Sequence, residues 1–305
     1  MMDANIVDIF YLVDEFCKEF DKAKEGHILQ QDCSKKSRNR QFRMSDSEVI
    51  TIMIYFHLKQ HRNLKHFYVN YIQVHCKEYF PHTLSYNRFV ELQQKAVLPM
   101  TVFLKMCCLG KCTGISFIDA TSLKVCHIKI ERSNKTFKGL ATKGKTTIGW
   151  FFGFKLHIVI NDKGEILDFV ISQANTDDRQ PLKDKKFHKR VFGKVFGDKG
   201  YISSDLFEKL FVDGIHLITR LKKNMKNSLM LMSDKIYLRK RALIETVNDQ
   251  LKNICQIEHT RHRCVNNFLG NLVSGLIAYN FLPKKPSLNL EIIDIPSTAI
   301  MKMSA

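Results

Sequence analysis

Apolar side chains recur at helical spacing through the first hundred residues. Between residues 6 and 20 they fall at Ile6, Ile9, Phe10, Val13, Phe16 and Phe20, on one face of a helix. Ser45 and Glu48 form a capping-box pattern before a second apolar segment, and a third segment runs from about residue 63 to 79. Ser85 can cap a fourth helix, and Pro99 is expected to interrupt the chain after it. None of these segments has a strand pattern.

The pattern changes near residue 110, where short apolar runs replace the helical spacing. The expected strands are residues 114–119, 150–160, 165–172, 194–198 and 215–220, and the expected helices begin near residues 177, 204, 239 and 264. The tetrapeptide at 161–164, Asn-Asp-Lys-Gly, is a turn signal that makes its two flanking strands a hairpin. The sequence therefore predicts three parts: a helical N-terminal domain (1–110), a mixed α/β domain (111–282) and a poorly ordered tail (283–305).

Secretion and membrane insertion are not expected. The first twenty residues carry Asp3, Asp8, Asp14 and Glu15, which a signal peptide would lack. Residues 264–283 are free of charge, but four asparagines among them indicate a buried helix rather than a bilayer span. The nine cysteines include no CxxC pair, so we expect reduced thiols in a cytoplasm.

Charge gives the first indication of a partner. The chain carries 48 Lys and Arg against 30 Asp and Glu, a net charge of +18. Residues 114–282 hold 29 of the basic and 16 of the acidic residues, so +13 lies in the α/β domain. A globular protein this basic attracts polyanions, nucleic acid first among them.

Two acids in this basic domain follow apolar runs. Asp119 and Asp198 each end an expected strand, where Asp is disfavoured unless it has a role. If the strands are neighbours, both carboxylates meet at one edge of the sheet, where the apolar stripe of the helix carrying Glu245 must also pack. Three converging carboxylates repel one another unless a cation lies between them, and Mg²⁺ suits oxygen ligands completed by phosphates. Such a site can perform phosphoryl transfer.

The helix of Glu245 also carries two cations on the same face. Arg241 precedes Glu245 by four residues and Lys252 follows it by seven, with Asn248 and Asp249 flanking this face. One interpretation is an exposed helix held by ordinary salt bridges. The other is a metal-binding Glu between two cations that hold DNA phosphates.

These residues resemble a known family. The segments Phe-Ile-Asp-Ala-Thr at 117–121, Phe-Gly-Asp-Lys-Gly-Tyr at 196–201 and Arg241-x3-Glu245-x6-Lys252 are similar to the three acidic blocks of DDE transposases of bacterial insertion sequences. Residues 137–162 and the overall layout are most similar to the insertion-sequence 982 family, over nearly the whole chain to about residue 282. In one departure, Leu238 stands where relatives carry a Tyr three places before the Arg, and Tyr237 lies one place earlier.

The resemblance implies an RNase H-like, retroviral integrase-like core, with Asp119 on the first strand, Asp198 after the fourth and Glu245 on a late helix. It implies that these three acids are catalytic and bind two Mg²⁺ ions, for which Mn²⁺ can substitute. It further implies metal-dependent cleavage and strand transfer of double-stranded DNA, at element ends and target, by a homodimer. Such a protein would act in the bacterial cytoplasm at the nucleoid, without a membrane or a nucleotide cofactor. The alternative is a catalytically inactive DNA-binding protein derived from a transposase.

A second motif gives a competing hypothesis. Residues 139–146 match GxxxxGKT, the phosphate-binding loop of nucleotide hydrolases, but an expected strand follows where that loop requires a helix. A basic loop that holds DNA phosphates is the better interpretation, and its basic residues include Lys138, Lys143 and Lys145.

Several other residues have two possible roles each. Trp150 is expected in the core, with stacking on a DNA base as the alternative, and His127 and His157 are expected to be structural. Residues 85–95 form either a bundle helix or a helix that reads DNA ends. The remaining acids are expected to be a turn residue (Asp162), a solvent-facing strand residue (Asp168) and helix caps (Asp177 and Asp178).

Overall fold

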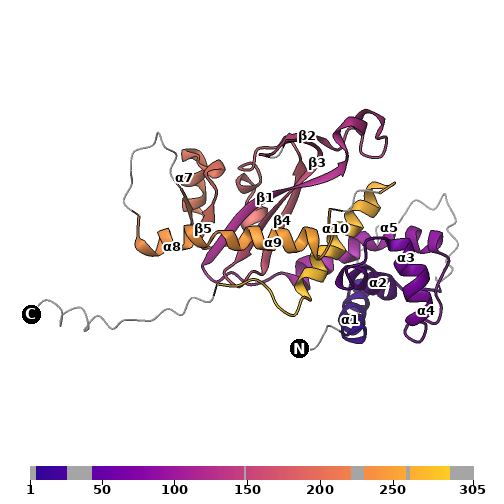
Figure 1. The fold of residues 1–305 in the computed structure, drawn as a ribbon. Helices are drawn as coiled ribbons and strands as arrows, with labels where there is room; N and C mark the ends of the chain where they lie inside the picture. The colour runs from indigo at the N-terminus through magenta and orange to yellow at the C-terminus, as the bar shows by residue number, and fades with distance from the viewer. Residues whose placement is uncertain (1–4, 26–42, 148, 221–229, 259–261, 289–305) are drawn as a thin grey trace, which may run out of the picture.

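The protein has a mixed α/β architecture, with helices at the N-terminal end and a central sheet (Figure 1). The computed structural model describes residues 5–25, 43–147, 149–220, 230–258 and 262–288. The tail predicted for 283–305 therefore lies outside the described residues from 289 onward. Within residues 283–288, the described part of this tail, the backbone N–H of Leu288 donates a 2.8 Å hydrogen bond to the carbonyl oxygen of Asp162.

Helices alone make up the described part of the chain before residue 115. They are α1 (Ile6–Glu25), α2 (Asp46–Leu58), α3 (Leu64–His66), a π-helical segment (Phe67–Ile72), α4 (Gln73–His75), α5 (Tyr86–Phe103) and a second π-helical segment (Leu104–Cys108). The capping box at the start of α2 is confirmed, since the N–H of Glu48 donates to Ser45 Oγ at 3.1 Å and the N–H of Ser45 to Glu48 Oε2 at 2.7 Å.

Two expectations about α5 are wrong. Ser85 precedes the helix, but its side chain makes no capping hydrogen bond. Pro99 lies within α5 instead of ending it. The turn beyond Pro99 buries Met100 and Phe103, and this apolar contact keeps the helix continuous despite the missing backbone donor.

The sheet has six strands: β1 (Ile115–Cys126), β2 (Thr142–Lys145), β3 (Trp150–Asn161), β4 (Ile166–Gln173), β5 (Gly193–Gly197) and β6 (Ile215–Thr219). The order is β2-β3-β1-β5-β6, and β4 also pairs with β3. Pairs among β1 to β4 are antiparallel, whereas β1 with β5 and β5 with β6 are parallel. This mixed sheet is consistent with the RNase H-like core that the resemblance implies.

One backbone contact in the sheet is unusually close. Gly153 of β3 lies beside Lys124 of β1, near an irregularity in the register between Lys124 and Cys126. A Cβ atom at Gly153 would lie only 2.0 Å from the carbonyl oxygen of Leu123. Glycine therefore lets β3 approach β1 at this point.

Five helices accompany the strands: α6 (Lys185–His188), α7 (Ser204–Val212), α8 (Met232–Lys240), α9 (Ala242–Asn253) and α10 (Val265–Asn280). The predicted stripe of α9 is confirmed, because Ile244, Val247 and Leu251 are fully buried. Helix α9 packs against β1 and so reaches the sheet from the C-terminal part of the chain.

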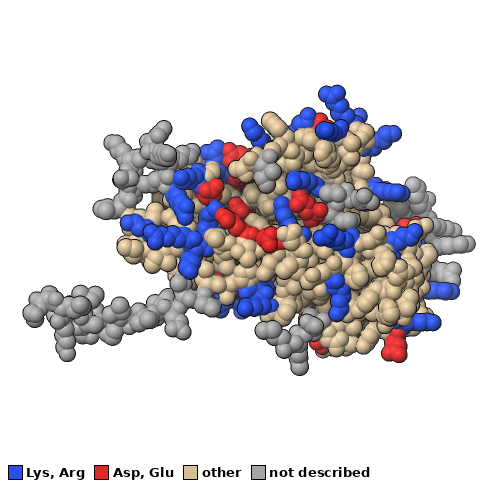
Figure 2. Space-filling view, in the orientation of Figure 1, with Lys and Arg blue, Asp and Glu red and all other residues tan. Residues whose placement is uncertain are grey.

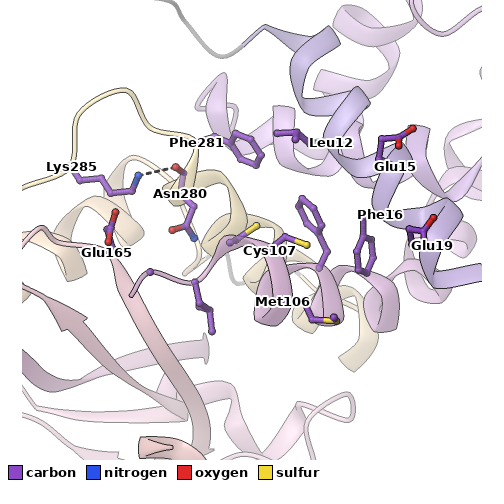
Figure 3. Close-up of a pocket in the computed structure, with 14 residues that line it drawn as sticks. Leu12, Glu15, Phe16, Glu19, Met106, Cys107, Glu165, Asn280, Phe281 and Lys285 are labelled. Atoms are coloured by element: carbon purple, nitrogen blue, oxygen red, sulfur yellow. Dashed lines mark hydrogen bonds between the residues drawn. The ribbon is translucent and has the colours of Figure 1, made fainter. Parts of the chain in front are cut away.

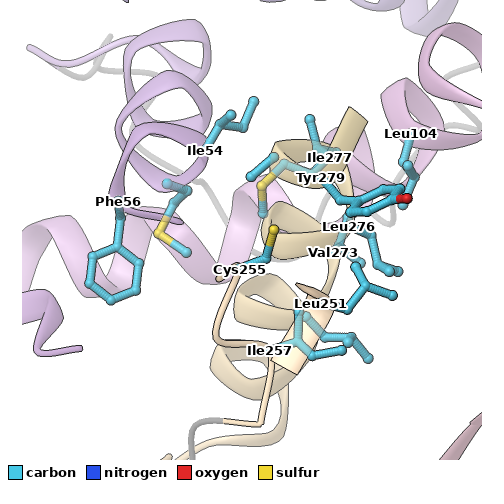
Figure 4. Packing of buried hydrophobic residues seen from close by; sticks show 14 of the residues in the cluster. Ile54, Phe56, Leu104, Leu251, Cys255, Ile257, Val273, Leu276, Ile277 and Tyr279 are labelled. Carbon is cyan, nitrogen blue, oxygen red and sulfur yellow. The ribbon is translucent and has the colours of Figure 1, made fainter. Parts of the chain in front are cut away.

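Helix α10 packs against helices from the other end of the sequence, α2 and α5 (Figure 4). His57 links α2 to α10, since its Nε2 lies 2.9 Å from Ser274 Oγ of α10. Its Nδ1 lies 2.5 Å from the carbonyl oxygen of Cys255, just after α9. Gly270 of α10 leaves room for α5, where an added Cβ would contact Val97 at 3.4 Å. One apolar core thus joins residues from both ends of the chain. Among the described residues, no helix combines the length and hydropathy that crossing a bilayer would demand.

Asp168 differs from the expectation of a solvent-facing residue. It is only 6% exposed, and its carboxylate pairs with Lys105 from the second π-helical segment. Both faces of β4 are covered at this point, so strand alternation alone could not assign the side chain to solvent.

Candidate active site

Two neighbouring strands bring Asp119 and Asp198 to the same edge of the sheet. The parallel register of β1 and β5 pairs Phe117 with Phe196, and each acid follows two residues later. These strands are therefore neighbours, which is the condition under which the two carboxylates were expected to meet. The prediction that Asp119 ends its strand is wrong, because β1 continues to Cys126 along β3 after its pairing with β5 stops. Asp198 follows the fifth strand rather than the fourth, because residues 142–145 form the short strand β2.

Helix α9 places three polar side chains over β1. Arg241, at the N-terminal boundary of α9, forms ion pairs with Glu245 and Asp119. Its Nη2 lies 2.7 Å from Glu245 Oε1, and its Nη1 lies 3.9 Å from Asp119 Oδ1. One turn beyond Glu245, the side-chain amide of Asn248 donates a 2.9 Å hydrogen bond to Asp119 Oδ2. The helix therefore brings a cation and an amide to a carboxylate of the sheet.

Asp198 and Glu245 line one cavity of about 420 Å³. Its other lining residues are Gly197, Lys199, Arg220, Leu238, Arg239, Arg241 and Ala242. The basic side chains around the cavity suit an anion, and Leu238 contributes an apolar wall where relatives carry Tyr. Tyr237 instead packs on Phe196, with ring centroids 5.3 Å apart. Figure 2 shows acidic side chains gathered on this view of the molecule with Lys and Arg on both sides.

The other predicted phosphate-binding residues are distributed more widely. Lys252 donates to Ser122 Oγ of β1 at 3.4 Å and lies 3.3 Å from Glu258 Oε2. Lys143 and Lys145 of β2 line a second cavity, of about 500 Å³, together with Asp178 and Gly200. Lys138 is exposed but lines neither cavity.

Burial dominates the electrostatics of Asp119. It raises the pKa of this carboxyl from 3.8 to about 6, against the opposing effects of Arg241 and the backbone N–H of Ala120. Glu245 and Asp178 raise the pKa further by like-charge repulsion. A cation therefore stabilises the charged form of Asp119, and two other acids lie near enough to raise its pKa.

Three residues at the site were not predicted from the sequence. Asn248 was expected only to flank the face of Glu245. Asp178 was expected to cap a helix, but its Oδ1 accepts a 2.8 Å hydrogen bond from Lys155 Nζ. Tyr201 is 2% exposed, and its hydroxyl has no hydrogen-bond partner among the described residues. Two of them had a sequence signal: Asn248 is three residues from Glu245 on the same helix, and Tyr201 ends the block Phe-Gly-Asp-Lys-Gly-Tyr at 196–201.

The ring of Tyr201 packs against the residues that precede the two acids. A Cβ added to Gly197, just before Asp198, would lie 3.1 Å from Tyr201 Cδ2 and 3.3 Å from Ile118 Cγ2, just before Asp119. Burial raises the pKa of the Tyr201 hydroxyl well above 10, and Asp119, Asp178 and Asp198 add to this shift. The hydroxyl therefore remains protonated among these carboxylates.

The remaining candidates have other roles. His157 is fully buried with its Nε2 2.7 Å from Ser172 Oγ, and burial lowers its pKa to about 4, as expected of a structural histidine. Asp177 accepts from the N–H and guanidinium of Arg179 rather than capping an α-helix. The GxxxxGKT segment runs into β2 and then β3, so the helix that a phosphate-binding loop requires is missing.

A further cavity, of about 640 Å³, lies apart from these acids (Figure 3). Leu12 and Phe16 of α1, Met106 and Cys107 of the second π-helical segment, and Phe281 line it. None of Asp119, Asp198 and Glu245 contributes to this lining.

The donor set suits a hard divalent cation in kind, because carboxylate oxygens are its preferred protein ligands. Two buried oxygens beside the acids, Tyr201 Oη and Asn248 Oδ1, have no partner in the described part of the chain. In the present arrangement Arg241 lies between Asp119 and Glu245, and within the described ranges no three Asp, Glu, His or Cys side chains come close enough together to hold a metal. The kinds of ligand present therefore fit such an ion, but in this arrangement Glu245 is paired with Arg241.

Comparison with solved structures gives only weak likenesses. A piggyBac transposase synaptic complex with hairpin DNA is 11% identical, with 90% of this chain and 73% of that chain covered and a TM-score of 0.48. The Mos1 strand transfer complex is 10% identical, with 80% and 85% covered and a TM-score of 0.22. The Mos1 paired-end complex with left transposon end is 12% identical, with 86% and 84% covered and a TM-score of 0.24. TM-scores this low establish no common fold.

Comparison with protein families is informative. No curated protein matches the chain. The sequence model of the family described as "Transposase DDE domain" matches residues 109–265, which include Asp119, Asp198 and Glu245. Because this match spans more than half of the sequence, the chain belongs to the transposase DDE domain family.

Proposed function

We propose that this protein is the transposase of a bacterial insertion sequence, of the insertion-sequence 982 type. It cuts DNA at the element ends and transfers the freed strands to a target. The observation that carries the proposal is the register of β1 and β5, which puts Asp119 and Asp198 two residues beyond paired positions, while α9 carries Glu245 into the cavity that Asp198 lines. Residues 111–282 are the RNase H-like catalytic domain, and residues 1–110 are the helical domain that binds DNA ends.

Asp119, Asp198 and Glu245 are the residues that would hold two Mg²⁺ ions, with Mn²⁺ as a substitute. DDE transposases generally act with divalent metal ions. When bound, such ions make an attacking oxygen more nucleophilic and stabilise the leaving oxygen of a phosphodiester.

The chain's own residues bind and orient the DNA. Arg241 and Lys252, at the two ends of α9, hold phosphates on either side of the acids, and the cavity beside Arg241 has room for one. Asn248 fixes the orientation of the Asp119 carboxylate through its hydrogen bond. Lys138, Lys143 and Lys145 add phosphate contacts from the segment before β3. Cleavage uses water and joining uses the freed 3′-hydroxyl, so no bond between protein and DNA forms.

The partner is double-stranded DNA, at the element ends and at the target. Two ends must be brought together for transfer, so the active species is a homodimer on DNA. The protein acts at the nucleoid of the bacterial cytoplasm. Neither a nucleotide nor a membrane takes part.

The test is strand cleavage of DNA that carries the inverted repeats flanking the gene, with Mg²⁺. Wild-type protein should nick these ends, and Asp119→Asn and Glu245→Gln should each abolish nicking while DNA binding persists. Asp249→Asn is the matched control, because Asp249 is an exposed acid of the same helix whose carboxylate accepts a hydrogen bond from the side chain of Asn253. Wild-type rates in the Asp119 or Glu245 variants would overturn the assignment.

One observation favours a second candidate, a DNA-binding protein without catalysis derived from a transposase. Arg241 neutralises Asp119 and Glu245 where a metal would otherwise do so. Specific binding to the element ends that persists in EDTA, with no cleavage in Mg²⁺ or Mn²⁺, would support this candidate.

A further inference from the structure

Trp150, the single tryptophan of the chain, is exposed to solvent. It begins β3, pairs with Lys145 of β2, and leaves 60% of its surface open. The prediction that Trp150 is a core residue is therefore wrong: the residue begins β3 at the end of the sheet, and the described residues leave most of its surface open. An indole this open leaves a large flat apolar surface in water, and such rings often mark binding sites.

A cation accompanies this ring. Lys145 Nζ lies 5.8 Å from the centroid of the indole, and Lys145 forms no ion pair with any described residue. The other two lysines of the same cavity are paired, Lys143 with Glu131 at 2.7 Å and Lys155 with Asp178 at 2.8 Å. Lys145 is therefore the lysine of this cavity whose charge is available to an anion next to the indole.

The cavity leads from Trp150 toward the candidate active site. Its volume is about 500 Å³, and its lining includes Asp178 and Gly200. Asp178 raises the pKa of Asp119, and Gly200 lies two residues beyond Asp198. A DNA strand whose phosphate lies at the acids can therefore extend along this cavity toward the indole.

We propose that Trp150 and Lys145 form a binding site for an unpaired base of a DNA strand. The indole stacks on the face of the base, and Lys145 binds the neighbouring phosphate. A duplex hides its base faces by stacking, so only an unpaired base presents one to an exposed ring. This inference rests on the proposed function, and it assigns to the substrate a distorted or single-stranded segment beside the reacting phosphate.

Because the chain has one tryptophan, its fluorescence reports this contact directly. The full-length protein is titrated in EDTA with a single strand of the element end and with the same strand made abasic at every position, which keeps the phosphates. The base-containing strand should quench Trp150 and the abasic strand should not. Trp150→Ala should lower affinity for the base-containing strand about tenfold and leave affinity for the abasic strand unchanged.

Variants separate stacking from charge. Trp150→Phe should retain part of the affinity for the base-containing strand. Lys145→Ala should weaken the binding of the base-containing and abasic strands alike. Phe211→Ala is the control, because Phe211 is an aromatic residue of α7 that is 63% exposed and lines neither of the two cavities near the acids. Equal quenching by both strands, or wild-type affinity in Trp150→Ala, would overturn the stacking site.

Cleavage distinguishes this inference from the function on which it rests. If wild-type protein nicks element ends in Mg²⁺ but shows no base-dependent quenching, the stacking site is refuted and the transposase function stands. If wild-type protein neither binds nor nicks these ends, both are refuted.

Discussion

The side-chain amide of Asn248 donates a 2.9 Å hydrogen bond to Oδ2 of Asp119, joining α9 to the middle of β1. The two residues are 129 positions apart in the sequence. The bond fixes one oxygen of Asp119 and leaves the other toward Arg241. Asn248 thus holds a half-buried carboxylate without adding charge to it.

Replacing this amide by a carboxylate should be costly. Asn248→Asp places two acids in contact at a position only 7% exposed, which raises the pKa of Asp119 and destabilises the protein at pH 8 by about 2 kcal/mol. Urea unfolding at pH 8 and pH 5 measures the effect, which should shrink at pH 5. Asn248→Ala, which removes only the hydrogen bond, should show a smaller loss with little pH dependence.

Asp119 should make the metal-free protein less stable as the pH rises. Its pKa in the folded state is about 6 against 3.8 for the ordinary group, so between these values the folded state binds more protons than the unfolded state. The free energy of unfolding should therefore fall from pH 4 to pH 6, by up to about 3 kcal/mol. Asp119→Asn should lose this slope, and Asp249→Asn should keep it.

Divalent cations should offset the loss of stability that deprotonation of Asp119 causes. Because Asp119 must be deprotonated to bind a metal, the affinity for Mg²⁺ should rise with pH through about 6. Calorimetric titration with Mg²⁺ at pH 5 and pH 7.5 measures this. An affinity equal at the two pH values would show that Asp119 does not bind the ion.

Arg241 pairs with two acids of the site and, in the proposed function, also holds a DNA phosphate. Arg241→Ala removes the cation between Asp119 and Glu245, so the pKa of Asp119 should rise and cleavage should fall about a hundredfold. Arg241→Lys restores the charge without the forked geometry and should recover part of the rate. The single-turnover cleavage rate at saturating DNA is the measurement, and equal rates in the Ala and Lys variants would show that charge is not what matters.

Tyr201 should tolerate loss of its hydroxyl but not of its ring. The hydroxyl is buried without a partner, so Tyr201→Phe should leave stability unchanged or raise it by about 1 kcal/mol in the metal-free protein. Tyr201→Ala opens a cavity beside Ile118 and should cost about 3–5 kcal/mol. Thermal unfolding of both variants distinguishes these effects, and destabilisation by Tyr201→Phe would indicate a partner for the hydroxyl.

Gly153 should be sensitive to a single methyl group. Gly153→Ala forces β3 away from the backbone of β1 and should cost about 1–3 kcal/mol. Gly200→Ala is the matched control: an added Cβ there meets nothing within 4 Å, and its effect should stay within about 0.5 kcal/mol. Equal unfolding midpoints for the two variants would contradict the close approach of the strands.

Sequence patterns singled out β1 and β5 because both are apolar runs followed by an acid, but left open whether the two strands are neighbours. They did not predict that β1 continues past Asp119, since residues 120–122 are small or polar and are held as a strand by pairing with β3. Trp150 looked like a core residue because its neighbours are apolar, but only the sheet order shows which end of a strand is open to solvent.

The helix periodicity of α9 placed Glu245 and Arg241 on one face, because residues four apart must be neighbours there. The same reasoning could not find Asp178 or Tyr201. Asp178 follows β4 and Tyr201 follows β5, and only the folded sheet brings them to Asp119. Local spacing predicts contacts within one element, whereas contacts between elements depend on topology.

The packing of α10 on α2 and α5 has a consequence for how the protein is made. On the ribosome, the first helices emerge long before the helix that covers them, and α9, which carries Glu245, also emerges late. An unfinished chain therefore has neither a closed core nor the third acid of the proposed site. A polypeptide interrupted before α9 lacks Glu245, so under the proposed function it could not cut DNA.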